Sequence, residues 1–392
     1  MLDTPPPAVG RYFDHNGSTP LHPSIQRLCL ELSREEYGNS AAAHPMGLRA
    51  AQHVNEARER LADVLGAEPS EIYFTSGGTE SDNWALFGTA ALRDSGHLVV
   101  SAIEHRAVLN AARELERRGF DLTVVQPHAD GAVHLRDVQA ALRDDTFLVS
   151  VMMANNETGV CQPVREIGAL CRERGILFHT DAVCAFGKLP VDVREVPCDL
   201  LSLSAHKFHA PKGVGLQYIR TGTSIAPLHF GCGHQDGLRS GSLNTVGIAA
   251  MAAAAQLVAE SKFAPVAELE ARRQQLWNGL RDLLPEAQRN GGGATLPNTL
   301  SVWFPDVPAP ALQARLADHG FSVAAGASAS KGQASHVLLA MGLSFERASE
   351  TLRFSLGAET SAQDVDLLLA ALPAAIEAAR SASPVVAAGT GG

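Results

Sequence analysis

Short apolar runs alternate with amphipathic stretches through the middle of the chain. Seven runs of strand length lie at residues 72–75, 98–101, 122–125, 147–152, 177–180, 200–203 and 215–219. Between several of them, segments such as 106–118 and 164–174 repeat apolar residues at helical spacing. Strands that alternate with helices predict an α/β domain with a mostly parallel seven-stranded sheet, and binding sites gather at the strand ends of such sheets.

The flanking segments predict how the rest of the chain is organised. Residues 54–65 place apolar side chains at helical spacing, and Gly66 is suited to end that helix. Glycines at 291–293 and Pro297 mark loops, after which shorter strands and helices continue to about residue 380. We expect an N-terminal arm over 1–20, a large domain over 21–255, a smaller α+β C-terminal domain over 256–380 and a flexible tail over 381–392.

Composition and charge limit the classes of function. The 392 residues, 45% of them hydrophobic, are enough for a large and a small domain with separate cores. The formal net charge of −10 comes with no long basic run, so direct nucleic-acid binding is not expected. No apolar stretch reaches the roughly 20 residues that span a bilayer, and no signal peptide is recognisable. We expect no membrane association and a cytoplasmic location.

The cysteines predict neither a disulfide framework nor a metal centre. No pair shows the C-x-x-C spacing of zinc sites, so we expect reduced and mostly buried thiols and no metal site. The six are Cys29, Cys161, Cys171, Cys184, Cys198 and Cys232.

Two neighbouring strand ends carry the residue types that pyridoxal phosphate (PLP) requires. One apolar strand leads into Asp181, and the next leads into Ser204, His206 and Lys207. A lysine can hold the cofactor aldehyde as a Schiff base, while an aspartate can keep the pyridine nitrogen protonated so that the ring accepts electrons. Ser204 and His206 are placed to reach phosphate oxygens. The alternative for Lys207 is a solvated surface lysine.

A turn from a strand into a helix supplies a candidate phosphate site. Residues 74–81 pass through two glycines, the second of which is Gly78, into a helical pattern. Backbone N–H groups at the helix start, with the Thr79 hydroxyl, are suited to bind the cofactor phosphate. The alternative is an ordinary N-capped junction.

Three further residues complete the predicted site. His105 follows a strand and could stack on the pyridine ring and move a proton. Asn155 could hydrogen-bond the phenolic oxygen of the cofactor or a substrate carboxylate, whereas Asn156 suits a polar turn. Arg353 lies in a β-like stretch, where its guanidinium suits an α-carboxylate; a structural role between domains is the alternative.

Together these motifs resemble the cysteine desulfurase family of class V, fold type I PLP-dependent enzymes. The resemblance covers nearly the whole chain, with motifs at residues 75–83, 104–105, 155–157, 204–207 and 239–242. It implies a fold type I PLP-dependent transferase that acts on L-cysteine or a related amino acid. Lys207 then binds the cofactor covalently, His105 stacks on it, Asn155 contacts it and Arg353 holds the substrate carboxylate. The family further implies a homodimer, in which Ser242 reaches the phosphate of the neighbouring subunit, and a sulfur-acceptor protein.

The sequence departs from the family pattern at two positions. The resemblance places the persulfide-forming cysteine of the family at Ala329, and no cysteine follows Cys232. A methyl group cannot attack sulfur, and nearby serine hydroxyls are poor nucleophiles without a base. Cys184 stands where the family usually has a glutamine that hydrogen-bonds the ring hydroxyl. Ordinary sulfur transfer through this loop is therefore not expected.

Three functions are open at this point. The first is a cysteine desulfurase that yields L-alanine and bound sulfur, with its loop nucleophile replaced at position 329. The second is a PLP-dependent C–S lyase, or another β-elimination or transamination enzyme, which needs no loop thiol. The third is a non-catalytic scaffold that binds a sulfur-pathway partner. Retention of Lys207, Asp181, His105 and Arg353 argues against the third.

Overall fold

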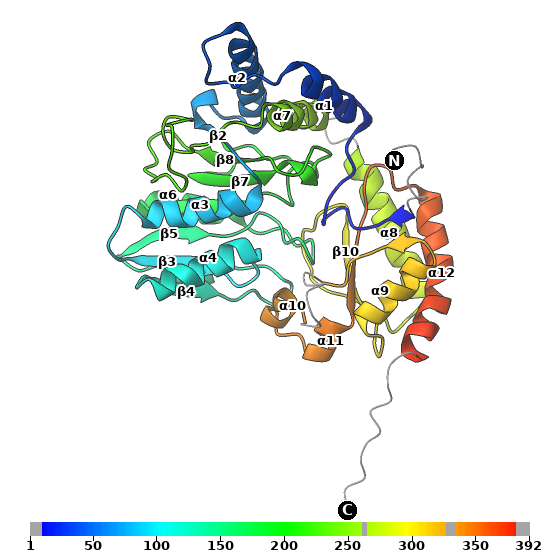
Figure 1. Ribbon diagram of the computed structural model, residues 1–392. Coiled ribbons are helices and arrows are strands. Elements are labelled where there is room, and N and C mark those ends of the chain that lie inside the picture. Colours follow the sequence, from blue (N-terminus) through cyan, green and yellow to red (C-terminus); the bar gives the residue numbers. More distant parts are fainter. Residues whose placement is uncertain (1–9, 261–264, 327–333, 382–392) are drawn as a thin grey trace, which may run out of the picture.

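The large domain is built around a seven-stranded sheet (Figure 1). The computed structural model describes residues 10–260, 265–326 and 334–381. From one edge to the other the strands are β2 (Ile72–Thr75), β8 (Gly215–Ile219), β7 (Leu200–Ser204), β6 (Leu177–Asp181), β5 (Thr146–Ser150), β3 (His97–Ser101) and β4 (Asp121–Val125). Only β8 runs antiparallel to its neighbours within this sheet. The predicted mostly parallel sheet is confirmed.

Helices cover both faces of this sheet because its strands are apolar on both sides. Leu98 and Leu148 point to a core that they share with Trp84. Their neighbours Val99 and Val149 point to the opposite core. The first core is covered by α3 (Gly78–Ala90) and α4 (Arg106–Arg117), and the second by α2 (Pro45–Leu65), α5 (Leu135–Ala141), α6 (Val164–Arg174) and α7 (Thr245–Glu260). Two shorter elements, α1 (Pro23–Glu35) and η1 (Pro69–Glu71), pack against α7 and α2.

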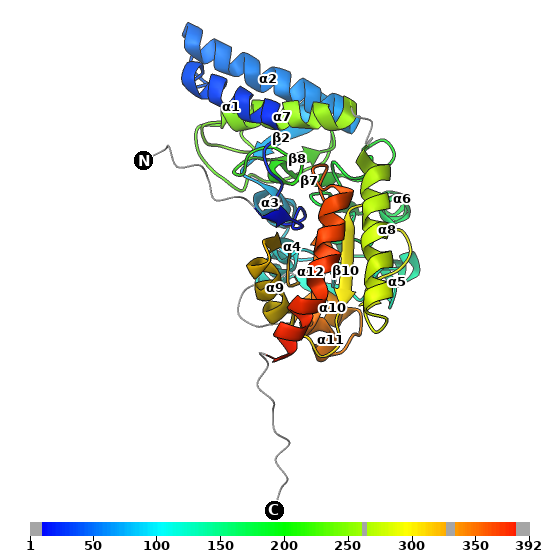
Figure 2. The same ribbon diagram turned by 90° about the vertical axis from the view of Figure 1, so that its right-hand side faces the viewer.

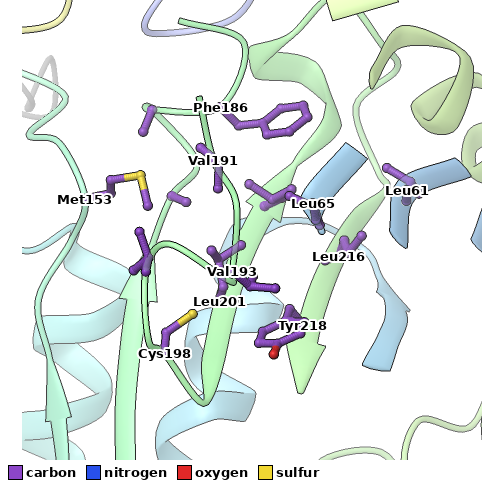
Figure 3. Packing of buried hydrophobic residues seen from close by; sticks show 14 of the residues in the cluster. Leu61, Leu65, Met153, Phe186, Val191, Val193, Cys198, Leu201, Leu216 and Tyr218 are labelled. Atoms are coloured by element: carbon purple, nitrogen blue, oxygen red, sulfur yellow. The ribbon is translucent and has the colours of Figure 1, made fainter. Parts of the chain in front are cut away.

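The contact between α2 and the sheet shows how the local sequence fixes this packing. Leu61 and Leu65 lie one helical turn apart and face the strand residues Leu201 and Leu216 (Figure 3). Gly66 ends the helix at φ 68°, a left-handed conformation that favours glycine. The helix predicted over 54–65 and its glycine stop are therefore present, although the helix begins nine residues earlier.

The small domain is an antiparallel sheet packed against helices. Its strands are β12 (Thr351–Ser355), β10 (Thr299–Trp303) and β9 (Gln288–Arg289), in that order. Three helices share its core, namely α8 (Pro265–Leu283), α9 (Ala309–Asp318) and α12 (Ala362–Ser381), while α10 (His336–Ala340) and α11 (Phe345–Ser349) precede β12. Figure 2 shows these helices below the group formed by α1, α2 and α7.

The N-terminal segment belongs to the small domain rather than to a separate arm. Strand β1 (Arg11–Tyr12) pairs in parallel with β11 (Phe321–Ser322). Phe13 is fully buried in the core of the small domain. Because this strand needs a partner more than 300 residues away, local sequence gave no sign of it.

The predicted boundary at residue 255 falls inside α7, which continues to Glu260 and packs against α2 of the large domain. The alanine-rich sequence of α7 gives no internal stop signal before that point. Helix α12 ends at Ser381, and the rest of the predicted tail lies outside the described residues. Among the helices of the described chain, none is long and apolar enough to cross a bilayer.

Candidate active site

Most of the predicted cofactor residues meet in one cavity of about 420 Å³ at the carboxyl ends of β6 and β7. Those on its wall are Gly78, Thr79, His105, Asp181, Ser204, His206 and Lys207. They come from the start of α3, the start of α4 and two adjacent strand ends. Parallel strands end on the same edge of a sheet, which is why residues far apart in sequence share a cavity.

Lys207 stands on a single 3-10 turn, η2 (Ala205–Lys207), directly after β7. Its amine is partly buried and donates hydrogen bonds to the backbone oxygens of Asn16 and Gly17, the latter at 3.0 Å. The N-terminal segment is held there by Thr19, whose backbone N–H donates to the His206 carbonyl at 2.9 Å. The lysine is therefore not a solvated surface residue.

Asp181 and His105 are electrostatically linked across the cavity. Asp181 is only 5% exposed, and its Oδ1 accepts a hydrogen bond from the Val183 N–H at 2.8 Å. Burial raises the pKa of Asp181, whereas the charges of His105 and Lys207 lower it. Desolvation lowers the pKa of His105, and Asp181 opposes that shift. The site thus holds a buried carboxylate that a cationic ring nitrogen would stabilise.

The start of α3 leaves little room for a side chain at Gly78. Gly77 has a φ of 153°, and a Cβ on Gly78 would lie 2.8 Å from Val183 Cγ2. The first N–H groups of a helix have no partner within the helix and carry partial positive charge, so they can bind an anion. His206 lies on the same wall, and burial lowers its pKa to about 4.

The structure places Asn156 on the cavity wall and Asn155 behind it. Asn155 is fully buried, and its Oδ1 accepts hydrogen bonds from the N–H groups of Glu157 and Thr158, both at 2.9 Å. Its Nδ2 donates to the Ile103 carbonyl at 2.9 Å. Asn156 lines the cavity instead. The assignment of Asn155 to the cofactor and substrate is corrected: it shapes the turn, a common use of asparagine side chains.

Arg353 bridges three parts of the chain. It is 5% exposed on β12, and its guanidinium donates to the Asn156 carbonyl at 2.9 Å and to the Asp14 carboxylate. Its Nε has no hydrogen-bond partner among the described residues. The bridging role that the sequence left open is therefore present, and its predicted contact with a substrate carboxylate stays a prediction.

With this geometry in place, comparisons with known proteins identify the family. Residues 11–368 match the family model described as Aminotransferase class-V. The chain belongs to this family. The chain is 39% identical over 383 residues to a protein named cysteine desulfurase IscS from Proteus mirabilis. The match covers 95% of this chain and 94% of that protein.

Solved structures agree with this assignment of the class-V chain. A structure titled NifS-like protein superposes with a TM-score of 0.89 at 38% identity, covering 94% of this chain and 99% of that one. Another, titled SspA in complex with cysteine, gives a TM-score of 0.79 at 35% identity over 90% of this chain and 100% of that one. The predicted fold type I class, the resemblance to cysteine desulfurases and the PLP cofactor are confirmed.

The cavity of the class-V chain fits PLP. It offers an amine at Lys207, a buried carboxylate at Asp181 that accepts one hydrogen bond from the described residues, and a glycine-lined helix start. These groups match the aldehyde, the ring nitrogen and the phosphate of the cofactor. Cys184, 6% exposed, also lies on the wall.

Two further predicted residues are not among those found on the cavity wall. Ser242 is exposed in the loop between β8 and α7 of the class-V chain and is not on the cavity wall. Its contact with the phosphate of a neighbouring subunit stays a prediction. Ala329 lies outside the described residues.

Sequence reasoning missed a buried acidic layer beneath the cavity. Glu104 is fully buried, accepts hydrogen bonds from the Ser101 hydroxyl and the Met152 N–H, and has its pKa raised by burial to about 8. Burial and the charge of Asp181 also raise the pKa of Asp82. Both acids lie inside recognised motifs, at 75–83 and 104–105, but the polar residues beside them in the sequence gave no sign of burial.

A buried imidazole, His179, lies beside Asp82, with its Nε2 3.7 Å from Asp82 Oδ1. Its two ring nitrogens lie 2.8 Å from the Ser150 hydroxyl and 2.9 Å from the Ser202 hydroxyl. Burial lowers its pKa to about 3, so the ring is neutral at physiological pH. A neutral layer of this kind leaves Asp181 as the carboxylate best placed to be charged.

Proposed function

We propose that this chain is a PLP-dependent enzyme that acts on the sulfur of L-cysteine or a related amino acid, as its relatives' names indicate. One observation carries the proposal: Lys207 and Asp181 leave adjacent strands and share a cavity with His105 and a helix start. Bound PLP supplies an aldehyde for the amine and a ring that withdraws electrons from the substrate.

The residues of the chain divide the work of binding. The Lys207 amine, which now donates to two backbone carbonyls, would hold the cofactor aldehyde, and Asp181 would keep the ring nitrogen protonated. The helix start at Gly78 and Thr79, with Ser204 and His206, holds the phosphate. We further propose a homodimer, in which Ser242 completes the phosphate site of the other subunit.

Proton transfer falls to His105. Its Nδ1 accepts a hydrogen bond from the Ala107 N–H at 3.2 Å, which places the ring proton on Nε2. A lowered pKa keeps the ring neutral, so it can accept and return a proton near neutral pH. Asn156 is placed to hydrogen-bond the cofactor, and Arg353 can bind the substrate carboxylate if it gives up Asp14.

The sulfur step is where this chain differs from a desulfurase that carries its nucleophile on the loop. Alanine at position 329 has no atom that can attack the substrate sulfur. We expect bound L-cysteine to be processed slowly, without a persulfide on that loop and without onward transfer to an acceptor protein. The variant Ala329→Cys should gain both alanine formation and a persulfide.

A second candidate is C–S cleavage by β-elimination, which gives pyruvate rather than alanine. It needs no loop thiol, and a cysteine in place of the usual glutamine, at Cys184 on the cavity wall, favours a changed reaction. Membership of an enzyme family argues against the third possibility, a scaffold without catalysis.

The six cysteines form no disulfide, which suits a reducing compartment and supports a cytoplasmic location.

One experiment tests the proposal. Purified protein is saturated with PLP, its absorption spectrum is recorded before and after L-cysteine, and alanine and pyruvate are assayed together. Borohydride reduction followed by peptide mapping should locate the cofactor on Lys207. The variant Lys207→Ala should lose the adduct, while Lys212→Ala, a change of another lysine on the cavity wall, should keep it. An adduct on another residue, or none, would contradict the proposal.

A further inference from the structure

Two histidines and two aspartates gather at the turn between β4 and α5, partly open to solvent and outside the active-site cavity. The chain reverses there because the Gly131 N–H donates to the His128 carbonyl at 2.8 Å and the His128 N–H donates to the Ala132 carbonyl at 2.8 Å. Gly131 has a φ of 86°, which this tight turn requires. The reversal brings His128 and His134 side by side.

The four side chains form two acid–imidazole pairs. The rings of His128 and His134 stack with their centroids 3.8 Å apart and their planes 17° apart. His128 Nε2 lies 2.6 Å from Asp137 Oδ2, and His134 Nε2 lies 3.5 Å from Asp130 Oδ2. One ligand atom from each of His128, His134 and Asp137 lies within 4.8 Å of the others.

This donor set matches a borderline transition-metal ion. Imidazole nitrogen and carboxylate oxygen are preferred ligands of Zn²⁺, which binds them at about 2.0–2.2 Å in tetrahedral geometry. Ligand atoms around such an ion are about 3.3 Å apart, so the observed spacing must contract slightly. The side chains can make this change because all four are partly open to solvent.

A hydrogen bond from the backbone already orients one of the two aspartates, Asp130. Asp130 Oδ1 accepts a hydrogen bond from the Ala132 N–H at 2.9 Å, which directs Oδ2 toward His134. Fixing a ligand through a second hydrogen bond is a common feature of protein metal sites. Arg136 also approaches this cluster, but its Nε lies 3.6 Å from Asp137 Oδ1 and not from Oδ2, the oxygen that faces His128.

We propose that His128, His134 and Asp137 bind one Zn²⁺, with Asp130 as the fourth ligand. The ion takes the place of the direct contact between His128 Nε2 and Asp137 Oδ2, and the imidazole binds it through an unprotonated Nε2. The site uses no cysteine, which is why cysteine spacing predicted no metal. It also lies in a different part of the chain from the PLP cavity, so it does not depend on the proposed function.

The location gives the ion a structural consequence. The Asp130 carbonyl accepts a hydrogen bond from the Gly292 N–H at 2.7 Å, and a Cβ on Gly131 would lie 3.3 Å from the end of the Met341 side chain. The turn therefore touches two parts of the small domain. An ion that fixes the turn stabilises this contact and raises the midpoint of thermal unfolding.

The test uses full-length, PLP-loaded protein that has been stripped with a chelator and dialysed against Zn²⁺ alone. Wild type should retain one more equivalent of zinc than His134→Gln, with an affinity roughly tenfold or more higher at this site. The matched control His319→Gln, a change of an exposed histidine at the end of α9, should bind like wild type. His134 caps α5 without a side-chain hydrogen bond, so its substitution leaves the fold intact.

Zn²⁺ should raise the unfolding midpoint of wild type and His319→Gln but not that of His134→Gln. In wild type, Co²⁺ should give a tetrahedral spectrum without a thiolate charge-transfer band, and this spectrum should disappear in His134→Gln. Equal zinc content in wild type and His134→Gln would overturn the site. So would a cobalt spectrum with a thiolate band that is lost in Cys232→Ser.

Discussion

At Asp181, burial and local charge act in opposite directions on one carboxyl group. Burial raises its pKa, and the charges of His105 and Lys207 lower it. A protonated pyridine nitrogen would decide the balance in favour of the carboxylate, because a charged hydrogen-bonded pair offsets the cost of desolvation. Burial thus disfavours the charged form of Asp181 when no cofactor is bound, and this charged form is what the cofactor nitrogen requires.

The variant Asp181→Asn tests this pairing. It should retain the lysine adduct but lose most of the turnover of L-cysteine, by on the order of 10²-fold or more, because a neutral amide cannot hold the ring nitrogen protonated. Turnover is followed as alanine plus pyruvate, and cofactor content by absorbance. Asp144→Asn, at an exposed position, should behave as wild type. Undiminished turnover in Asp181→Asn would refute the assigned role.

Glu104 gives a prediction about pH. Its pKa is raised by burial to about 8, so the folded protein keeps a proton that the unfolded chain releases above the ordinary carboxyl range. The unfolded state therefore binds fewer protons, and the free energy of unfolding falls as pH rises toward 8, by at most about 1.4 kcal/mol per unit. Above pH 8 this contribution stops changing.

Glu104→Gln should remove that slope, because glutamine is neutral and can still accept the hydrogen bonds from Ser101 and Met152. Urea unfolding between pH 5.5 and 8 measures it. Glu116→Gln, an exposed change on α4, should leave the slope as in wild type. Parallel pH profiles for wild type and Glu104→Gln would show that Glu104 ionises normally.

Among single residues, the sequence correctly predicted those that directly follow a strand. It did not predict which of two neighbouring residues in a turn faces the cavity. Lys207 and Asp181 were predictable because adjacent parallel strands end on one edge. The choice between Asn155 and Asn156 was not, because either can stabilise a turn and only the fold shows which one faces inward. The His128 and His134 cluster was missed because only cysteine spacing was used to search for metals.

At the scale of elements, the junction between β2 and α3 restricts what can line the phosphate site. A Cβ on Gly78 would lie 2.8 Å from Val183, and both residues line the cavity. A larger residue at 78 pushes Val183 into the space of the cofactor. The requirement for glycine is thus set by packing between two walls of the site.

Gly78→Ala should therefore weaken PLP binding by about tenfold or more, with little loss of fold stability. Cofactor titration followed by absorbance gives the affinity. The control Gly292→Ala adds a Cβ that meets Asp130 at an ordinary 3.5 Å and should bind PLP like wild type. If Gly78→Ala and Gly292→Ala bind PLP equally well, the space around residue 78 is less restricted than the structure indicates.

The predicted elements were most accurate where pattern and burial agree. The strand over 72–75 and the helix over 164–174 have the predicted bounds, because a buried run and a glycine stop define them locally. The predicted strand at 147–152 extends two residues too far, since β5 ends at Ser150 and Met152 lines the active-site cavity. Apolar character alone does not separate a strand from a buried loop.

At the scale of the whole molecule, a few buried polar residues join the two domains. Asn16 is 1% exposed, and its side chain bonds to the Asn156 carbonyl at 3.1 Å, Thr299 at 2.8 Å and Asn298 at 3.1 Å. Its own carbonyl accepts from Lys207. One residue thus links the N-terminal segment, the large domain and the small domain next to the catalytic amine.

Asn16→Ala should lower the free energy of unfolding by about 2–5 kcal/mol, because it leaves several buried groups without partners. It should also weaken L-cysteine binding, since the domains no longer meet correctly beside Lys207. Denaturant unfolding and substrate titration measure the two effects. Asn278→Ala, on the exposed face of α8, should change stability by no more than about 0.5 kcal/mol. A small effect in both variants would remove Asn16 from this role.

The long-range contacts of the N-terminal segment, including the pairing of β1 with β11, also determine when the active site can form during translation. Residues 11–16 are made long before their partners, and Asn16 must wait for Ser355, 339 positions later. At about 5–20 residues per second, that delay is roughly 20–70 seconds. Nascent chains therefore cannot close the catalytic pocket while they are being made, and vitamin B6 capture belongs to the finished polypeptide.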